Sequence, residues 1–259
     1  MTLSAAASGL TTTALLVLAR VVGMVLVAPV FSSHTVPLMV RAGLAIALAL
    51  VLTPGLGVVH PGGIVELGLA TVVQLAIGVL MGMVLAVFLA VFGLAGEVVT
   101  YQLGVGLAAQ ANPSLLAAGS FLSEWQTLLG IFVYVVAGGP ELSVTALHAS
   151  FQAIPLSAMV IPGPALGFVV GLMQTALMVA LLMAMPMVTA GFIVNISVGV
   201  ISRAFPQINA YFLALPINFG VSLLVFLALL PILLSVIPNF WNMGWRDLSH
   251  LLVLLEGKP

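Results

Sequence analysis

The chain has 259 residues, of which 63% are hydrophobic and only 4% are charged. Because a soluble domain carries about 25% charged residues, this composition excludes an ordinary soluble globule and indicates an integral membrane protein. A formal net charge of −1 gives no reason to expect a nucleic-acid partner, and the lack of cysteine excludes disulfides and thiolate metal sites.

Apolar runs separated by proline, glycine and polar residues predict the membrane segments. Without sustained period-two alternation they are expected to be helices, because only helices and closed barrels satisfy the backbone in lipid. After Glu141 the prolines divide an uncharged stretch into a short and a long segment, and the tail repeats tryptophan and leucine at helical spacing. The main runs cover residues 10–30, 38–52, 67–96, 121–137, 165–200 and 211–237.

The lengths of these runs differ from those of simple membrane spans. A span needs about 20 residues, so the runs 67–96 and 165–200 must tilt, kink or leave the hydrocarbon layer. The run 38–52 is too short to span comfortably. This mixture favours helices that pack mainly against other protein subunits.

Small residues recur four apart on both long runs, at Gly78 and Gly82 and at Gly167 and Gly171. Such spacing lets helix backbones approach closely, although chance pairs are expected among 26 glycines. The stretches 95–105 and 190–200 share the pattern A-G-x-x-V-x-x-x-x-G-V. The match indicates two related halves or an accident of composition.

Arg20 is the charge placed deepest in an apolar run. A charge at the centre of a membrane helix costs about 2.5–3.5 kcal/mol on insertion scales, so a buried partner is expected. Glu97 and Glu124 are the candidate mates. Together with Arg203 they lie at or near run ends, where plain interface placement is the alternative.

No pattern in the chain suggests catalysis. There is no paired-carboxylate face, phosphate loop or H-E-x-x-H motif, and the four histidines are scattered beside predicted breaks. Neither an enzyme activity nor a cofactor or metal is therefore expected.

The loop after the first long run, residues 101–114, is more informative. Gly104 and Gly106 permit unusual backbone angles, and Pro113 biases Asn112 away from helix. Since non-helical backbone at membrane depth needs protein or water around it, the loop is either an external turn or an element inside a pore.

Three stretches in order resemble the FliR family of flagellar export-gate proteins, whose kin serve virulence secretion systems. They are "ARVVGMVLVAPVFSSHTVPLMVRAGLAIALALVLTP" (19–54), "LGVGLAAQANPS" (103–114) and "AFPQINAYFLALPINFGVSLLV" (204–225). The resemblance covers nearly the whole chain. The middle stretch departs from the more methionine-rich or acidic loop of relatives.

The resemblance implies an all-α membrane protein of long kinked helices and helical hairpins in a hetero-oligomeric helical assembly in the bacterial inner membrane. One copy would join FliP and FliQ in the flagellar basal body, FlhB and FlhA would associate, and unfolded flagellar subunits would pass through. One FliR-like unit would occupy 1–259, with a FliP-like half at about 1–140, a FliQ-like half at about 141–240 and an amphipathic tail at 241–259.

It also implies roles for particular residues. The mid-chain loop would plug the closed pore through Gly104, Gly106, Gln110, Asn112, Pro113 and Ser114. The stretch 203–220 would form a hairpin turn whose prolines set the break, with Arg203, Gln207 and Asn209 satisfying backbone or contacting neighbouring subunits. The alternative function is a stand-alone small-molecule transporter or ion channel, which usually needs more ionisable groups near the midplane than Arg20 alone.

Overall fold

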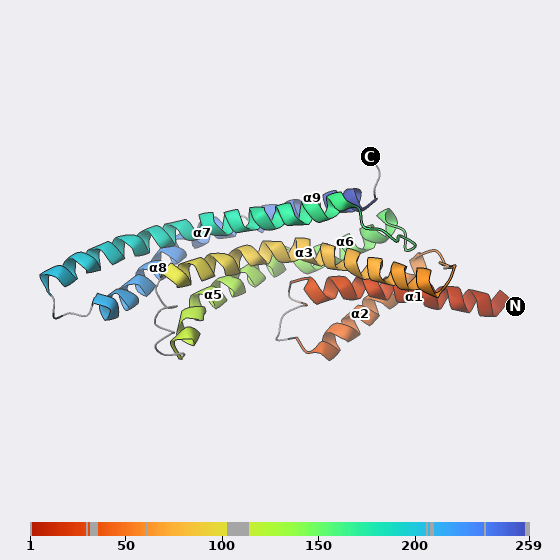
Figure 1. The fold of residues 1–259 in the computed structure, drawn as a ribbon, viewed down its shortest axis with the longest axis horizontal. Helices are drawn as coiled ribbons and strands as arrows, with labels where there is room; N and C mark the ends of the chain where they lie inside the picture. Colours follow the sequence, from red (N-terminus) through yellow and green to blue (C-terminus); the bar gives the residue numbers. More distant parts are fainter. Residues whose placement is uncertain are drawn as a thin grey trace. The chain divides into compact units, whose positions relative to one another are not determined.

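The computed structural model describes residues 2–29, 31, 36–60, 62–102, 114–205, 207, 210–235 and 237–256. Every regular element within these ranges is a helix, which confirms the predicted all-α membrane fold (Figure 1). The helices are α1 Thr2–Val27, α2 Leu38–Leu52, α3 Ile64–Gln102, α5 Ser114–Val136, α6 Gly139–Ala153, α7 Gly163–Ala204, α8 Ala210–Ser235 and α9 Ile237–Glu256, with a 3₁₀ turn at Thr53–Gly55.

The two long helices exceed even the long apolar runs. α3 has 39 residues and α7 has 42 residues, because helical backbone continues through the polar ends of each run. α2 coincides with its run, since Pro37 precedes its first residue. Five described segments are long and apolar enough to cross a membrane, and α5 with α6 gives a sixth if counted as one interrupted span.

The predicted hairpin turn is much shorter than expected. α7 ends at Ala204 and α8 begins at Ala210, so Pro216 lies inside α8 and sets no break. A proline removes one helical hydrogen bond, and membrane helices tolerate this loss where neighbouring groups satisfy the freed carbonyl. Pro231 also lies within α8.

Local sequence explains both ends of α6. Gly138 adopts a left-handed conformation (φ 79°) that redirects the chain, and Pro140 and Glu141 occupy the first turn, where a missing N–H and a negative charge are favourable. At the other end Ile154 is extended, as expected of a residue before a proline, so the helix stops before Pro155.

The chain divides into two compact units, each described here by itself. Unit 1 comprises Met1–Val87, Ala137–Met173 and Asn239–Pro259, and unit 2 comprises Phe88–Val136 and Gln174–Pro238. α3 and α7 each contribute to both units. Both units therefore draw on both of the halves suggested by the family resemblance, and the boundary near residue 140 stays a prediction.

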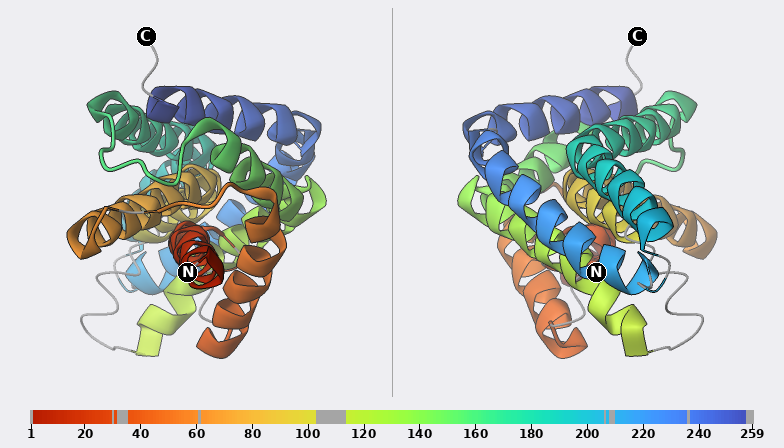
Figure 2. Two further views of the ribbon diagram at one scale, coloured as in Figure 1. Left: turned by 90° about the vertical axis from the view of Figure 1, so that its right-hand side faces the viewer. Right: turned by 90° about the vertical axis from the view of Figure 1, so that its left-hand side faces the viewer.

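Unit 1 is organised around α1. α2 packs beside it, as the red and orange helices show (Figure 2), and the buried residues of α2 are Ala45 and Ala49. The backbone N–H of Val59 donates to Thr13 Oγ1 at 3.0 Å, which ties the segment before α3 to α1. Gly244 of α9 lies so close to α6 that a Cβ would be 2.7 Å from Leu142 Cδ2. The core side chains include Leu16, Val17, Val21, Ile77, Met81, Leu85, Leu142, Leu147, Leu251 and Leu252.

Unit 2 has its own apolar core. It joins α3, α7 and α8 through Ala95, Val99, Ala180, Ala184, Met187 and Phe226. α3 and α5 pack closely at one glycine from each helix. A Cβ on Gly96 of α3 would be 2.6 Å from Ser123 Cα, and a Cβ on Gly130 of α5 would be 2.9 Å from the Phe92 ring. Glycine at these two positions permits the close approach.

Candidate functional site

Arg20 lies in the C-terminal half of α1, near the middle of the candidate span Gly9–Val27, and its exposed fraction is 0%. Its burial agrees with the expectation from the sequence. The guanidinium sits in unit 1 and draws its partners from α3 and from the end of α6.

Four hydrogen bonds hold the guanidinium. Arg20 Nε donates to Gln74 Oε1 at 2.7 Å, and one terminal nitrogen donates to Ser150 O at 2.7 Å and Ser150 Oγ at 3.1 Å. The other terminal nitrogen donates to Ile154 O at 3.1 Å. The guanidinium carbon also lies 4.5 Å from the centre of the Phe151 ring, a cation–π geometry.

Gln74 extends the same network. While its Oε1 accepts from Arg20, its Nε2 donates to Pro155 O at 3.2 Å and Leu156 O at 3.0 Å. Two side chains from α1 and α3 thus bind four backbone carbonyls where α6 ends. The last carbonyls of a helix carry its partial negative charge and need partners when buried, so the arrangement satisfies both the charge and the helix end.

All these partners are neutral. The predicted ion pair of Arg20 with Glu97 or Glu124 is therefore wrong for the described structure. Both glutamates are exposed and belong to unit 2. Carbonyl dipoles at a helix end stabilise the guanidinium without the further cost of desolvating a carboxylate. The sequence identified Arg20 as a buried polar residue but did not identify Gln74. Gln74 could have been found as the one amide side chain in the apolar run 67–96.

Close packing of α1 on α3 surrounds this network. A Cβ on Gly78 would collide with Arg20 O and with Met24 N, and one on Gly82 would be 2.9 Å from Met24 O. Gly23 makes the reciprocal approach from α1 to Leu75 O. At Gly167 and Gly171 a Cβ would meet no atom within 4 Å, so no close approach within the described structure requires glycine there.

The other predicted polar residues lie outside the buried core. Arg203 and Gln207 are exposed, as Glu97 and Glu124 are, and Glu124 makes an interaction of its own. Asn209 lies outside the described residues. Roles for these residues at subunit contacts stay predictions.

The predicted plug falls almost entirely outside the residues that the structure describes. Gly104, Gly106, Gln110, Asn112 and Pro113 belong to that segment, and Ser114 is the first residue of α5. The plug also stays a prediction.

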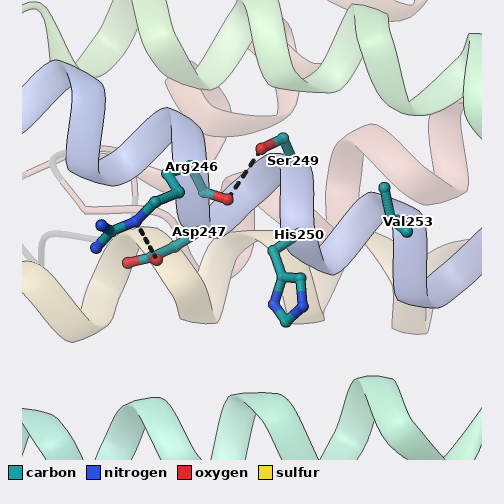
Figure 3. A pocket seen from close by; sticks show the side chains of 5 residues that line it. All are labelled: Arg246, Asp247, Ser249, His250 and Val253. Atoms are coloured by element: carbon teal, nitrogen blue, oxygen red, sulfur yellow. Dashed lines mark hydrogen bonds and ion pairs between the residues drawn. The ribbon is translucent and has the colours of Figure 1, made fainter.

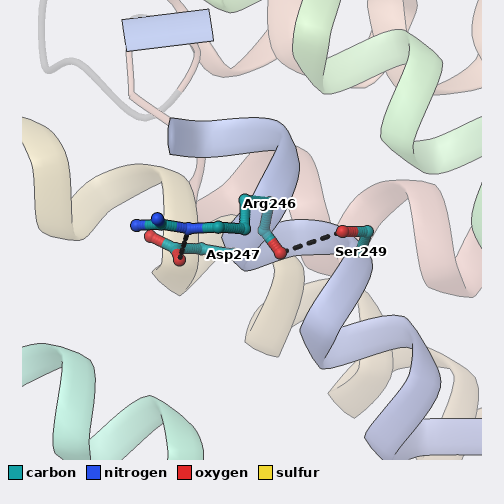
Figure 4. A network of polar contacts seen from close by, with 3 residues as sticks. All are labelled: Arg246, Asp247 and Ser249. Atoms are coloured by element: carbon teal, nitrogen blue, oxygen red, sulfur yellow. Dashed lines mark hydrogen bonds and ion pairs between the residues drawn. The ribbon is translucent and has the colours of Figure 1, made fainter. Parts of the chain in front are cut away.

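α9 carries a small polar cluster beside a pocket of about 460 Å³ lined by Arg246, Asp247, Ser249, His250 and Val253 (Figure 3). Arg246 Nε lies 3.7 Å from Asp247 Oδ1, and Ser249 Oγ donates to Arg246 O at 2.9 Å (Figure 4). Burial raises the pKa of Asp247, and Arg246 opposes that shift. His250 makes an edge-to-face contact with Phe168, with ring centroids 4.7 Å apart.

The side chains of this cluster make contacts within and between helices. His250 is occupied with Phe168, and no hydroxyl in the pocket hydrogen-bonds to a base: Ser249 donates to a backbone carbonyl. Within the described part of the chain, no group of three or more His, Asp or Glu could hold a metal ion. The main polar centre, at Arg20, is built to join helices.

Unit 2 contains polar side chains that the sequence reading did not single out. Gln126, Asn218 and Ser222 are buried, with exposed fractions of 0%, 2% and 1%. Asn218 Nδ2 donates to Asn195 Oδ1 at 2.7 Å, and Gln126 Nε2 lies 3.7 Å from Met187 Sδ. As with Gln74, each of these residues could have been recognised in the sequence as an uncharged polar residue inside an apolar run.

Comparison with known proteins agrees with this architecture. Residues 11–243 match the family described as bacterial export proteins, family 1. The flagellar biosynthetic protein FliR of Caulobacter vibrioides is 26% identical over 242 residues, which cover 92% of this chain and 94% of the relative. FliR of Aquifex aeolicus is 24% identical over 86% of this chain and 87% of its own length. FliR of Escherichia coli is 24% identical over 91% of this chain and 90% of its own length.

The family match covers far more than half of the chain, and the relatives align over most of their lengths. Five described segments are long and apolar enough to cross a membrane, as expected from the composition. The chain therefore belongs to the FliR family of bacterial export proteins, as a multi-pass inner-membrane component of the flagellar export apparatus.

Proposed function

We propose that this chain is a structural and pore-forming subunit of the flagellar type III protein export gate. One copy assembles with FliP and FliQ, FlhB and FlhA associate with the assembly, and unfolded flagellar subunits pass through it. The loop around Gly104–Ser114 plugs the closed pore. The chain carries out no catalysis and needs no cofactor.

The observation that carries this proposal is the exposed apolar surface of α7. Large apolar side chains are exposed from Leu166 to Val200, including Met178, Leu182 and Phe192 at 62%, 63% and 59%. At about 1.5 Å per residue that stretch is roughly 50 Å long. The hydrocarbon core of a bilayer is only about 30 Å thick, so lipid cannot cover it at ordinary tilt angles.

The uncovered part of α7 needs another protein. Exposed apolar surface outside the hydrocarbon layer marks an interaction site. A stand-alone transporter would instead bury its helices on one another and expose a belt no taller than the bilayer. Membership of a bacterial export family agrees with the assembled alternative.

The test is the mass of the detergent-extracted complex, measured by native mass spectrometry after co-expression with FliP-like and FliQ-like proteins of the same source. We expect one copy of this chain in a large, defined hetero-oligomer. A stable monomer or homodimer that ignores both partners would overturn the proposal and favour the transporter. Expression without the partners is the control, and should give poor yield.

A further inference from the structure

α9 carries apolar and polar residues on opposite sides. Its buried residues belong to unit 1 and include Leu248, Leu251, Leu252 and Leu255, each at most 6% exposed. Its exposed residues include Arg246 and His250, and the half-buried Trp245 directly precedes Arg246. Among the described helices, α9 is not one of the candidate membrane spans. This pattern is typical of a helix that lies along a membrane surface, where tryptophan is also enriched.

The pocket on α9 is lined by residues of this exposed side (Figure 3). Its volume of about 460 Å³ is within the roughly 300–1,000 Å³ of small-molecule sites. Arg246, His250 and Val253 share one helix face, because residues three and four apart are neighbours on a helix surface. Figure 3 shows the Arg246 guanidinium and the Asp247 carboxylate together at one end and Val253 at the other. The pocket therefore runs from a pair of opposite charges to an apolar side chain.

The charged end of the pocket offers donors and acceptors side by side. Arg246 Nε faces Asp247 Oδ1 at 3.7 Å, which is longer than a hydrogen bond. The Arg246 side chain is 75% exposed, so its terminal nitrogens remain to bind a phosphate in bidentate geometry. The Asp247 side chain is only 15% exposed, and a carboxylate withdrawn from water needs hydrogen-bond donors. At 3.7 Å Arg246 supplies charge but no full hydrogen bond, whereas a primary ammonium carries three donors.

The geometry points to a binding site on α9 for a phospholipid whose headgroup joins a phosphate to a primary ammonium, as in phosphatidylethanolamine. Arg246 binds the phosphate, Asp247 accepts hydrogen bonds from the ammonium, and Val253 contacts the adjoining hydrocarbon. His250, whose ring is held against Phe168, forms the wall between the two ends. A bound headgroup of this kind would hold α9 at the membrane surface. The site does not depend on the proposed role in the export gate.

Asp247 gives the site its selectivity among phospholipids. Phosphatidylcholine carries the same two charges, but its quaternary ammonium has no N–H to donate to the carboxylate. Phosphatidylglycerol has the phosphate without the cation, and would place uncompensated negative charge beside Asp247. Because a hydrogen bond to a charged group is among the strong ones, its loss should weaken binding about tenfold. Phosphatidylethanolamine should therefore bind in preference to both of the other lipids.

Lipid competition, read by native mass spectrometry, tests the site in the full chain within its complex, after detergent exchange has removed bound lipid. Phosphatidylethanolamine, phosphatidylcholine and phosphatidylglycerol of distinguishable mass are added together in equal amounts. We expect about ten retained phosphatidylethanolamine molecules for each molecule of the other two. Equal retention of the three lipids would show non-selective surface lipid, and a preference for phosphatidylglycerol would show a plain anion site. Either result would overturn the proposal.

Two variants connect the preference to the pocket. Asp247→Asn keeps the shape of the side chain, and should bring the ratio of phosphatidylethanolamine to phosphatidylcholine close to one. Arg246→Gln should reduce retention of both lipids. Glu141→Gln, which neutralises an exposed carboxylate on α6, is the matched control and should keep the original ratio. In lipid-free detergent the pocket variants should melt at the temperature of the unaltered chain, which separates lost binding from misfolding. An unchanged ratio in Asp247→Asn would contradict the site.

A protein segment with neighbouring charges of both signs could fill the same pocket, and cross-linking in the native membrane separates it from lipid. Val253 is 56% exposed and lines the apolar end of the pocket, so a photoreactive amino acid can replace it. The lipid predicts an adduct with the mass of a phospholipid on the complete complex. A cross-link to another protein chain would assign the pocket to a partner and overturn the assignment to lipid.

Discussion

Arg20 shows how a single residue can join three helices inside a membrane protein. Its four hydrogen bonds run to Gln74 on α3 and to backbone and side-chain groups at the end of α6. Because a guanidinium presents its donors in a fixed planar fork, this geometry favours arginine over lysine. The position therefore demands both the positive charge and the shape of the group.

Arg20→Leu should destabilise the protein by roughly 3–5 kcal/mol, because the substitution leaves buried carbonyls and Gln74 without their partner. Arg20→Lys should recover only part of the loss. The measurement is the thermal midpoint and the yield of assembled complex after detergent extraction. Arg246→Leu is the control, since the Arg246 side chain is 75% exposed and its ion pair contributes little. Normal complex yield from Arg20→Leu would refute the joining role.

The sequence predicted that Arg20 is buried but misidentified its partner. Depth within an apolar run can be read from the chain. The partner cannot, because the carbonyls of Ser150 and Ile154 become available only where α6 stops, and Arg20 meets them across sequence separations of 130 and 134 residues. Side-chain charges are visible in a sequence, whereas unpaired backbone groups appear only in a fold.

At the scale of elements, the glycines of α1 and α3 set how closely these helices approach. Gly78 and Gly82 were predicted from their spacing, and Gly23 supplies the matching position on α1. The same spacing at Gly167 and Gly171 corresponds to no close contact in the described structure. Spacing alone does not distinguish the two pairs, because the approach depends on which helix lies opposite.

Gly78→Ala should destabilise unit 1 by about 1–3 kcal/mol, because the new Cβ collides with the backbone of α1, which can move little. Gly68→Ala on the same helix is the matched control: no atom lies within 4 Å of its Cβ position, so helix propensity should make it neutral or stabilising. Thermal midpoints of the two variants in one detergent decide the question. Equal midpoints would show that α1 and α3 can separate at no cost.

Helix positions followed from the sequence better than helix ends did. Apolar runs identified the main helices because lipid demands them, and Pro37 fixed the start of α2. α3 and α7 run beyond their apolar stretches since polar residues such as Glu97 and Arg203 fit a helix equally well. Pro216 gave a false break, because a proline within a membrane helix need not end it.

At the scale of the whole molecule, the division into discontinuous units departs from the order of the sequence. Two long helices contribute to both units, and the chain leaves unit 1 and returns to it. A division read from the sequence follows the order of residues along the chain. The compact units instead follow contacts between residues that are distant along the chain, such as Arg20 and Ile154.

Deletion of Gly106–Ser114 should leave the gate assembled and make the membrane permeable to small ions, if this loop obstructs the pore as proposed. The measurement is ion leak in cells or in vesicles that contain the purified complex. Replacement of the same residues by a Gly-Ser segment of equal length is the control, and tests whether bulk alone restores the seal. An assembled complex without a leak would remove the plug assignment.

The Arg20 network also has a consequence for synthesis. Arg20 leaves the ribosome long before Ser150 and Ile154, which lie 130 and 134 residues later. At about 5–20 residues per second, α1 waits on the order of ten seconds for the groups that hold its guanidinium. The network that joins α1 to α3 and α6 can therefore close only after synthesis has reached Ile154, so α1 is held by its full set of hydrogen bonds well after it has been made.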